Sequence, residues 1–273
     1  MAKKEQATVP AWTTLEVVRR GPIELIGLAR PKVHNAFDET LIAELKAAVG
    51  AAADAPEVRV IVIHGTGASF CAGADLAWMK RMAAYGHAEN LADAKALATM
   101  LATLDRLPKP TIARVQGPVF AGGTGLVAAC DVAIGTPEAK FCFSEAKLGL
   151  SPSTISPYVL RAIGERMARR YFLSAEVFDA EEAYRIGMLS AVVATAELDP
   201  TIDNVLKHLL AGSPEAHAKI KELVRAVGGR PVDDALSAET AKRIAEIRVS
   251  PEGKEGIASF LEKRKASWCL PKS

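Results

Sequence analysis

Residues 58–64, VRVIVIH, constrain the fold more than any other part of the chain. This run is rich in β-branched residues and is typical of a strand with both faces buried in a parallel sheet. Helical stretches at residues 38–54 and 74–107 alternate with further strand-like segments such as TIARVQG and DVAIGT. Such alternation predicts right-handed βαβ crossovers and a mostly parallel sheet. We therefore expect an α/β fold with a βαβ-built core.

The two ends of the chain differ in pattern from this core. Short apolar runs at residues 15–19 and 23–29, on either side of Gly21-Pro22, predict a hairpin, and Asp38 is the expected N-cap of the first helix. From about residue 152 the pattern is almost entirely helical, with expected N-caps at Ser174, Asp179, Ser213, Asp233 and Ser250. We divide the 273 residues into a core at 1–200 and a helical C-terminal region at 201–273.

Composition excludes several classes of protein. Hydrophobic residues make up 49% of the chain and charged residues 24%, which is typical of a folded globular protein. The net charge of +2 gives no global field that would attract nucleic acid or a membrane surface. No stretch reaches the length of about 20 apolar residues that a membrane span needs, and the N-terminus lacks the apolar run of a secretory signal. The four cysteines show no paired spacing, and the five histidines show no i, i+4 pair, so we expect no metal site and a reducing cytoplasmic location.

The segment FAGGTGLVAACD (120–131) raises the question of a nucleotide site. Its glycines match the G-x-G-x-x-A variant of a dinucleotide fingerprint, and an acidic residue, Glu145, follows at a suitable distance. That kind of site, however, needs a full helix directly after the glycines. Too few residues separate this turn from the next strand-like segment, so we disfavour dinucleotide binding.

A second turn gives a better explanation. The segment VIVIHGTGASFCAGADLAWM has the same design, a buried strand followed by a glycine-rich turn and a helix beginning near Ala74. Two such junctions on neighbouring strands would bring two free backbone N–H groups together at helix N-termini, where they stabilise negative charge on an oxygen. Either turn alone is explained by tight chain reversal, but the pair of them predicts an oxyanion hole.

Several stretches, in this order and spacing, resemble the enoyl-CoA hydratase/isomerase (crotonase) superfamily along nearly the whole chain. They are ARPKVHNAFD (29–38), GTGASFCAGADL (65–76), PKPTIARVQGPVFAGGTGLVAACD (108–131), FCFSEAKLGLSP (141–152), AEEAYRIGMLSAVV (180–193) and GIASFLEKRKASW (256–268). The resemblance implies a crotonase (ClpP-like) fold and an acyl-CoA thioester as substrate, with coenzyme A as part of that substrate and no separate cofactor. It also implies a homotrimer or a dimer of trimers.

Site residues follow from the same resemblance. The two oxyanion-hole N–H groups would belong to Ala72 and Gly122, and Glu145 would be the catalytic acid/base. The residues expected to bind the acyl-CoA substrate are Arg30, Lys32, Ala36, Ala72, Gly73, Ala74, Asp75, Leu76, Gly122, Phe260 and Lys263. Of these, Phe260 and Lys263 match positions that reach the coenzyme's nucleotide end in some relatives from an adjacent subunit.

One departure from the family pattern affects the expected reaction. Hydratases of this family use two glutamates, and Gly125 stands where the first of them would be. A hydratase would then orient its water with Glu145 and a substitute such as Thr124 or Ser144. Isomerases that move a double bond from C3 to C2 need only one carboxylate to remove and return a proton. Isomerisation is therefore the alternative reaction.

Residues 120–183 are also similar to bacterial methylglutaconyl-CoA hydratases and their carboxygeranoyl-type relatives. This similarity implies a branched or carboxylated acyl chain. Arg161 is a candidate ion-pair partner for such a carboxylate, and the alternative is that it is a surface arginine. We accordingly expect hydration of an α,β-unsaturated, branched acyl-CoA. An inactive acyl-CoA binder and an RNA binder are the alternatives of another class, and the sequence has no aromatic-interleaved RNA motif.

Overall fold

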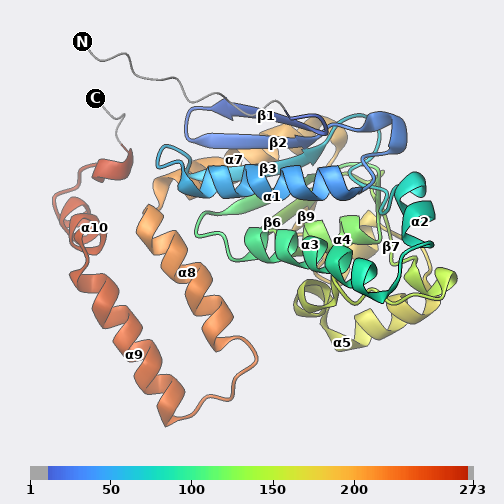
Figure 1. The fold of residues 1–273 in the computed structure, drawn as a ribbon. Helices are drawn as coiled ribbons and strands as arrows, with labels where there is room; N and C mark the ends of the chain where they lie inside the picture. Colours follow the sequence, from blue (N-terminus) through green and yellow to red (C-terminus); the bar gives the residue numbers. More distant parts are fainter. Residues whose placement is uncertain (1–11, 270–273) are drawn as a thin grey trace.

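The computed structural model describes residues 12–269, and a six-stranded sheet forms the centre of the fold (Figure 1). Its strand order is β1-β2-β3-β4-β6-β9, and a second sheet has the order β5-β7-β8. The strands are β1 (Leu15–Arg20), β2 (Ile23–Leu28), β3 (Val60–Gly65), β4 (Thr111–Val115), β5 (Pro118–Phe120), β6 (Val132–Gly135), β7 (Lys140–Cys142), β8 (Phe178–Asp179) and β9 (Ala191–Val192). In the large sheet only β1 and β2 pair antiparallel, which confirms the predicted hairpin and the mostly parallel core.

Helices connect and cover these strands. They are α1 (Glu39–Asp54), α2 (Leu76–Met82), α3 (His87–Asp105), α4 (Gly122–Ala129), α5 (Ser156–Ser174), α6 (Ala180–Arg185), α7 (Leu198–Ala211), α8 (Pro214–Val227), α9 (Asp234–Val249) and α10 (Pro251–Leu261). Short 3₁₀ turns lie at η1 (Pro31–Val33), η2 (Glu145–Leu148), η3 (Thr195–Glu197) and η4 (Ser267–Cys269). Four of the predicted N-caps after residue 152 are confirmed, namely Asp179, Ser213, Asp233 and Ser250. The prediction for Ser174 is wrong, because this serine is the last residue of α5.

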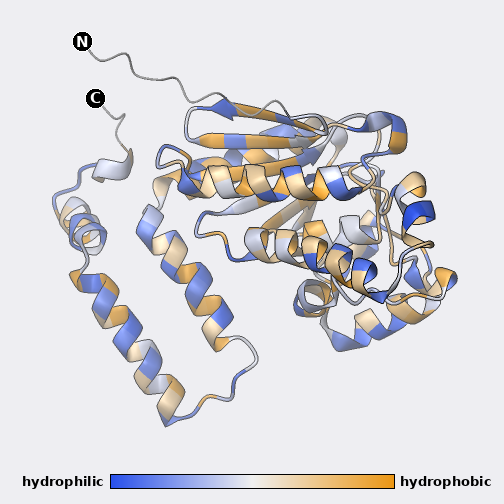
Figure 2. Ribbon diagram, viewed as in Figure 1, coloured by the Kyte–Doolittle hydropathy of each residue, from blue (hydrophilic) through white to orange (hydrophobic). Residues whose placement is uncertain are grey.

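Strand β3 explains why residues 58–64 read as a continuous apolar run. Ile61 and Ile63 lie in the large buried cluster that also contains side chains of α1 and α3. Val60 and Val62 lie in a second cluster, with side chains of α7. Successive side chains of a strand point to opposite faces, so a sheet covered on both sides needs apolar residues at every position. Figure 2 shows the resulting hydrophobic centre.

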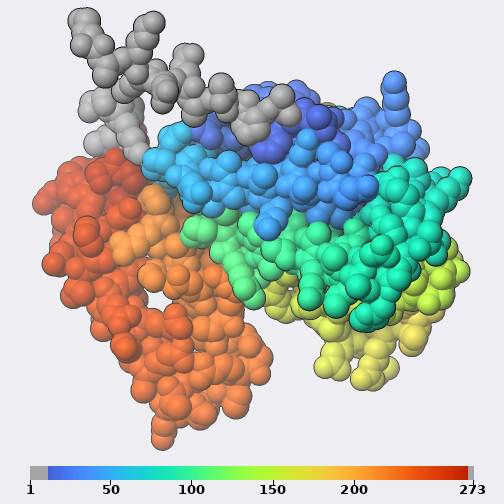
Figure 3. All heavy atoms as spheres, in the orientation of Figure 1, coloured from blue at the N-terminus to red at the C-terminus, as the bar shows by residue number. Residues whose placement is uncertain are grey.

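The helical region after residue 200 has two parts. Helix α7 covers the sheet with Leu198, Ile202 and Leu206, all buried against β3, β4 and β6. Helices α8, α9 and α10 stand away from the sheet, and Figure 3 shows them as an arm that extends beyond the main body. Within the described residues, no helix combines the length and apolar character that a membrane crossing requires.

Candidate active site

Two segments that the sequence analysis singled out lie side by side in the fold. Residues 71–75 run between residues 34–37 on one edge and β5 on the other. Cys71 donates its N–H to Pro118 at 3.2 Å and accepts from the N–H of Phe120 at 2.9 Å. The two glycine-rich turns therefore meet, as expected for the junctions of neighbouring strands.

The contact between the turns is close enough to require glycine. A Cβ atom at Gly123 would lie 2.5 Å from the carbonyl oxygen of Cys71, a distance that real Cβ atoms do not adopt. The small residues thus bring the start of α4 against the 71–75 segment, and a side chain at Gly123 would separate the two.

Ala72, the expected first donor of the oxyanion hole, is not available in this structure. Its N–H is donated to the carbonyl oxygen of His34 at 3.0 Å. Nor does it stand at a helix N-terminus, because α2 begins only at Leu76. The side chain of Asp75 accepts from the N–H groups of Ala77 and Trp78 at 2.8 and 3.2 Å and so fixes the start of that helix.

Ala74 offers the free N–H group instead. Phe37 pairs with Ala74 as a parallel bridge, in which Phe37 donates to Gly73 at 2.7 Å and accepts from Asp75 at 2.8 Å. In such a bridge the N–H of the central residue points away from its partner strand, here toward the end of β5 and the start of α4. Within residues 12–269, this N–H has no hydrogen-bond acceptor. Ala74 is therefore the candidate for the first donor in place of Ala72.

Gly122, the first residue of α4, supplies a second N–H group that has no acceptor among the residues the structure describes. First-turn N–H groups have no acceptor within their own helix, and the positive macrodipole end adds to their attraction for negative charge. The preceding Ala121 has φ 45° and ψ −119°, an uncommon conformation for a residue with a side chain, which costs roughly 1–3 kcal/mol. A Cβ at Gly122 would lie 2.9 Å from Cδ2 of Phe37, so this position also needs glycine.

Glu145 lies three residues after a strand end that is hydrogen-bonded to the N-cap residue of α4. It is the first residue of η2 and follows β7, whose last residue, Cys142, accepts the N–H of Ala121 at 2.8 Å. Its Oε2 is buried and has no hydrogen-bond partner among the described residues. Burial raises the pKa of Glu145 above its ordinary value of 4.5, against the opposing effect of its own backbone N–H. A partly desolvated carboxylate of this kind is suited to accept and return a proton.

The structure leaves no room for a side chain at position 125. A Cβ at this position would lie 2.2 Å from Cγ2 of Ile155 and 2.6 Å from its Cβ. Of the two expected substitutes, Thr124 is fully buried and donates its hydroxyl to the carbonyl of Ala121 at 2.6 Å, inside the first turn of α4. Ser144 directly precedes Glu145 and makes no side-chain hydrogen bond that caps η2.

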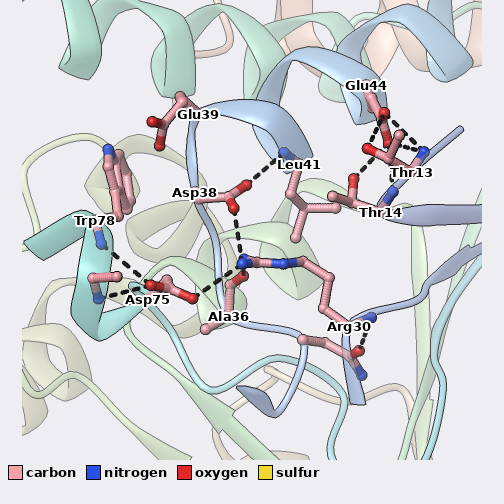
Figure 4. A network of polar contacts seen from close by, with 12 residues as sticks. Thr13, Thr14, Arg30, Ala36, Asp38, Glu39, Leu41, Glu44, Asp75 and Trp78 are labelled. Carbon is pink, nitrogen blue, oxygen red and sulfur yellow. Dashed lines mark hydrogen bonds and ion pairs between the residues drawn. The ribbon is translucent and has the colours of Figure 1, made fainter. Parts of the chain in front are cut away.

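Arg30 makes three contacts within the protein (Figure 4). Its Nη2 lies 2.8 Å from the carboxylate of Asp38 and 3.0 Å from that of Asp75. Its Nη1 donates to the carbonyl oxygen of Ala36, which is buried. One guanidinium thus joins the N-cap residues of α1 and α2 and holds the loop that carries Ala74.

The remaining residues that were expected to bind coenzyme A fall into two groups. Lys32 in η1 and Leu76 at the start of α2, two residues after Ala74 in the sequence, are exposed. Phe260, 82% exposed on α10, and Lys263 just beyond it lie at the opposite end of the molecule from α2 (Figure 1). A single chain does not bring these last two residues to the site.

Two further expectations concern a metal site and the side chain of Arg161. Within the part of the chain that the structure describes, no group of three or more His, Cys, Asp or Glu side chains could hold a metal ion. Arg161 donates to Asp105 at 2.5 Å, and its guanidinium lies over the ring of Tyr158. This arginine therefore already has its ion-pair partner on the protein surface.

Comparison with known proteins identifies the family to which the chain belongs. The family model described as enoyl-CoA hydratase/isomerase matches residues 19–270. The chain is 32% identical to the crotonyl-CoA hydratase of Syntrophomonas wolfei over 94% of its own length and 98% of that protein. A solved enoyl-CoA hydratase from Shewanella pealeana superposes with a TM-score of 0.92, at 40% identity, covering 94% of this chain and 97% of that one.

A third relative is Pseudomonas aeruginosa AtuE, whose structure matches with a TM-score of 0.89 at 34% identity and covers 94% of this chain and 100% of that one. Family model, sequence relatives and solved structures therefore agree over nearly the whole chain, and the fold is the crotonase fold. The protein belongs to the enoyl-CoA hydratase/isomerase (crotonase) family of enzymes.

Proposed function

We propose that this enzyme adds water to the double bond of a 2-enoyl-CoA, with Glu145 as its acid/base. The observation that carries the proposal is the buried Oε2 of Glu145, which lacks a partner among the described residues. Glu145 follows β7, whose last residue is hydrogen-bonded to Ala121 at the N-cap of α4. Keeping an unpaired carboxylate in a partly dry site reduces stability, so a role in proton transfer is its best explanation.

The thioester oxygen would be held by the N–H groups of Ala74 and Gly122. Two preorganised donors of this kind stabilise the negative charge that develops on the oxygen as the enolate forms, and removing one such donor costs about 3–4 kcal/mol in other enzymes. Ala74 replaces Ala72 in this role because the Ala72 N–H is already donated to His34.

The reaction balances with one carboxylate. The water oxygen forms a bond to the β-carbon while Glu145 takes one proton from that water, and the electrons of the double bond move onto the thioester oxygen. When the enolate collapses, protonated Glu145 gives the proton to the α-carbon. The product is a 3-hydroxyacyl-CoA, and Glu145 is again a carboxylate.

Isomerisation of a 3-enoyl-CoA to the 2-enoyl form is the second candidate. The packing of Ile155 against Gly125 supports isomerisation. This packing leaves no room for a second carboxylate that could help Glu145 to hold a water molecule. The same oxyanion hole would stabilise the dienolate while Glu145 carries a proton from the α-carbon to the γ-carbon.

A branched acyl chain of the 3-methylglutaconyl kind remains part of the proposal on the basis of sequence similarity in residues 120–183. Arg161 does not support a carboxylated chain, since Asp105 already pairs with it. The proposed location is the cytoplasm, which agrees with the free state of Cys71, Cys130, Cys142 and Cys269.

We also propose a trimer or a dimer of trimers, built through the helical arm. A cavity of about 520 Å³ lies between α8 and α9, and the arm exposes Val224 (63%) and Phe260 (82%). Apolar surface of this kind favours a partner, and Figure 2 shows hydrophobic residues along both helices. In such an assembly Phe260 and Lys263 would reach a neighbouring subunit's coenzyme. Sedimentation equilibrium tests this, with a mass of three or six 28.9-kDa chains expected and a monomer contradicting it.

Mass spectrometry of the products tests the reaction itself. The purified protein is mixed with a panel of 2-enoyl-CoAs, including 3-methylglutaconyl-CoA, and separately with a 3-enoyl-CoA. A product heavier by one water, lost in Glu145→Gln, supports hydration. A double bond that moves at unchanged mass supports isomerisation. Tight acyl-CoA binding without either reaction would make the protein an inactive binder.

A further inference from the structure

We propose that Ile155 is a specificity-determining residue, which limits this site to one carboxylate and thereby restrains hydration relative to isomerisation. The inference rests on the proposed function, since it concerns the site around Glu145. Gly125 lies one helical turn after Gly122 in α4, and its Cβ position is occupied by Ile155. Residues three apart on a helix are neighbours, so Ile155 packs beside the helix end that carries the Gly122 N–H.

A side chain at position 125 and an isoleucine at 155 exclude each other. The distances of 2.2 Å to Cγ2 and 2.6 Å to Cβ are far below a van der Waals contact. Rotating the isoleucine cannot relieve the second of these contacts, because Cβ does not move with the side-chain torsion angle. Even an alanine at position 155 would therefore clash with a side chain at position 125.

The backbone of Ile155 also has little freedom to move away. Its carbonyl oxygen accepts the N–H groups of Tyr158 and Val159 at 3.1 and 3.2 Å, at the start of α5. Its side chain is 2% exposed and belongs to the main hydrophobic cluster. Close-packed surroundings of this kind do not yield without a cost in stability.

The side chain of Ile155 fills the space beside Gly125, and its apolar character affects the reaction. Hydration needs a water molecule held at the β-carbon, and Ile155 offers that water no hydrogen bond where a carboxylate would offer two oxygens. Transfer of a proton within the acyl chain needs no such water and uses Glu145 alone. An apolar wall at this point therefore slows the first reaction more than the second.

A double substitution at positions 125 and 155 tests the inference. Gly125→Glu combined with Ile155→Gly supplies a carboxylate and the space for it, and Ile155→Gly alone is the matched control that has the space without the carboxylate. We expect the ratio of hydration to isomerisation to rise by tens of fold in the double variant over this control, below the roughly hundredfold that a well-placed acid or base contributes. An unchanged ratio in a folded, active double variant would overturn the inference.

Stability measurements test the contact independently of activity. Gly125→Ala should lower the melting temperature of the parent, yet raise or preserve it in the Ile155→Gly background, where the added methyl no longer meets Ile155 and alanine favours the helix. If Gly125→Ala lowered the melting temperature equally in both backgrounds, Ile155 would not be what excludes a side chain at position 125.

The two proposals can fail separately. If the parent neither hydrates nor isomerises any enoyl-CoA, the proposed function is wrong. Hydration gained by the double variant would then still support the role of Ile155, and a double variant that is folded but silent would refute it.

Discussion

The guanidinium of Arg30 lies 3.0 Å from the carboxylate of Asp75, and with Asp38 at 2.8 Å it connects the N-caps of α1 and α2. All three side chains are mostly buried. Arg30→Met leaves two carboxylates without their cation, and breaking a buried pair costs roughly 3–5 kcal/mol. We expect a loss near this range in the free energy of unfolding, measured in urea.

Arg81→Met is the matched control for Arg30→Met. Arg81 pairs with Glu39 at 2.7 Å, but both side chains are about half exposed, so water screens the pair and the loss should be much smaller than in Arg30→Met. Equal losses in the two variants would show that Arg30 does not stabilise the fold by joining the N-caps of α1 and α2.

Asp75 should make the protein sensitive to acid. Burial acts to raise its pKa, but the N–H groups of Trp78 and Ala77 together with Arg30 outweigh it and lower the pKa below the ordinary 3.8. A carboxyl group with a lowered pKa in the folded state stabilises the protein above its unfolded pKa, and this stabilisation is lost as the pH falls through the folded pKa. Asp75→Asn should therefore flatten the decrease in melting temperature below about pH 4, and an unchanged slope would contradict the assignment.

Glu145 should change the pH dependence of stability in the opposite direction to Asp75. Because burial raises its pKa, the charged form is disfavoured in the folded protein, so stability decreases as the pH rises from the unfolded pKa through the folded one. Glu145→Gln should be at least as stable as the parent at pH 7, with no such difference in strong acid. Its turnover should fall about 10²–10⁴-fold.

The dependence of activity on pH, on the acid side of the profile, should follow the ionisation of Glu145. Activity that depends on ionised Glu145 should rise with pH at an apparent pKa above 4.5, since burial raises that pKa. Glu165→Gln, at a side chain 80% exposed on α5, is the control and should keep both activity and profile. An unaltered profile in Glu145→Gln would exclude Glu145 as the titrating group.

Gly122 and Gly50 allow a comparison of two glycines in helices. A methyl group at Gly122 would meet Phe37 at 2.9 Å, whereas one at Gly50 in α1 would meet nothing within 4 Å. Gly50→Ala should stabilise the protein by up to about 1 kcal/mol and leave turnover unchanged. Gly122→Ala should reduce turnover, because it displaces a proposed donor. Equal turnover in both variants would argue against that donor.

The sequence predicted the core well because its signals are local. A strand covered on both faces must be apolar at every position. Asp38 is the N-cap of α1, as predicted, and accepts the N–H of Leu41 at 2.8 Å. Motif spacing likewise predicted the meeting of the two glycine-rich turns, a contact now observed between Gly123 and Cys71.

The details of the site depended on contacts between distant segments. Whether Ala72 or Ala74 has a free N–H is decided by His34 and Phe37, which lie more than thirty positions earlier in the chain. The expectation that a helix begins near Ala74 overlooked Asp75 as its N-cap, although an aspartate just before an apolar stretch is a recognised start signal. No sequence pattern connects Ile155 to Gly125, since only the packing of α5 on α4 brings them together.

Exchange of the α-protons of a saturated acyl-CoA in heavy water tests the central claim most directly. Hydration and isomerisation both need an enolate in the oxyanion hole and a base at the α-carbon, so butyryl-CoA should take up deuterium on the parent enzyme at a rate set by Glu145. We expect Glu145→Gln to bind butyryl-CoA still but to lose this exchange by about 10²-fold or more. Exchange at the parental rate in a variant that binds equally well would show that another group moves the proton.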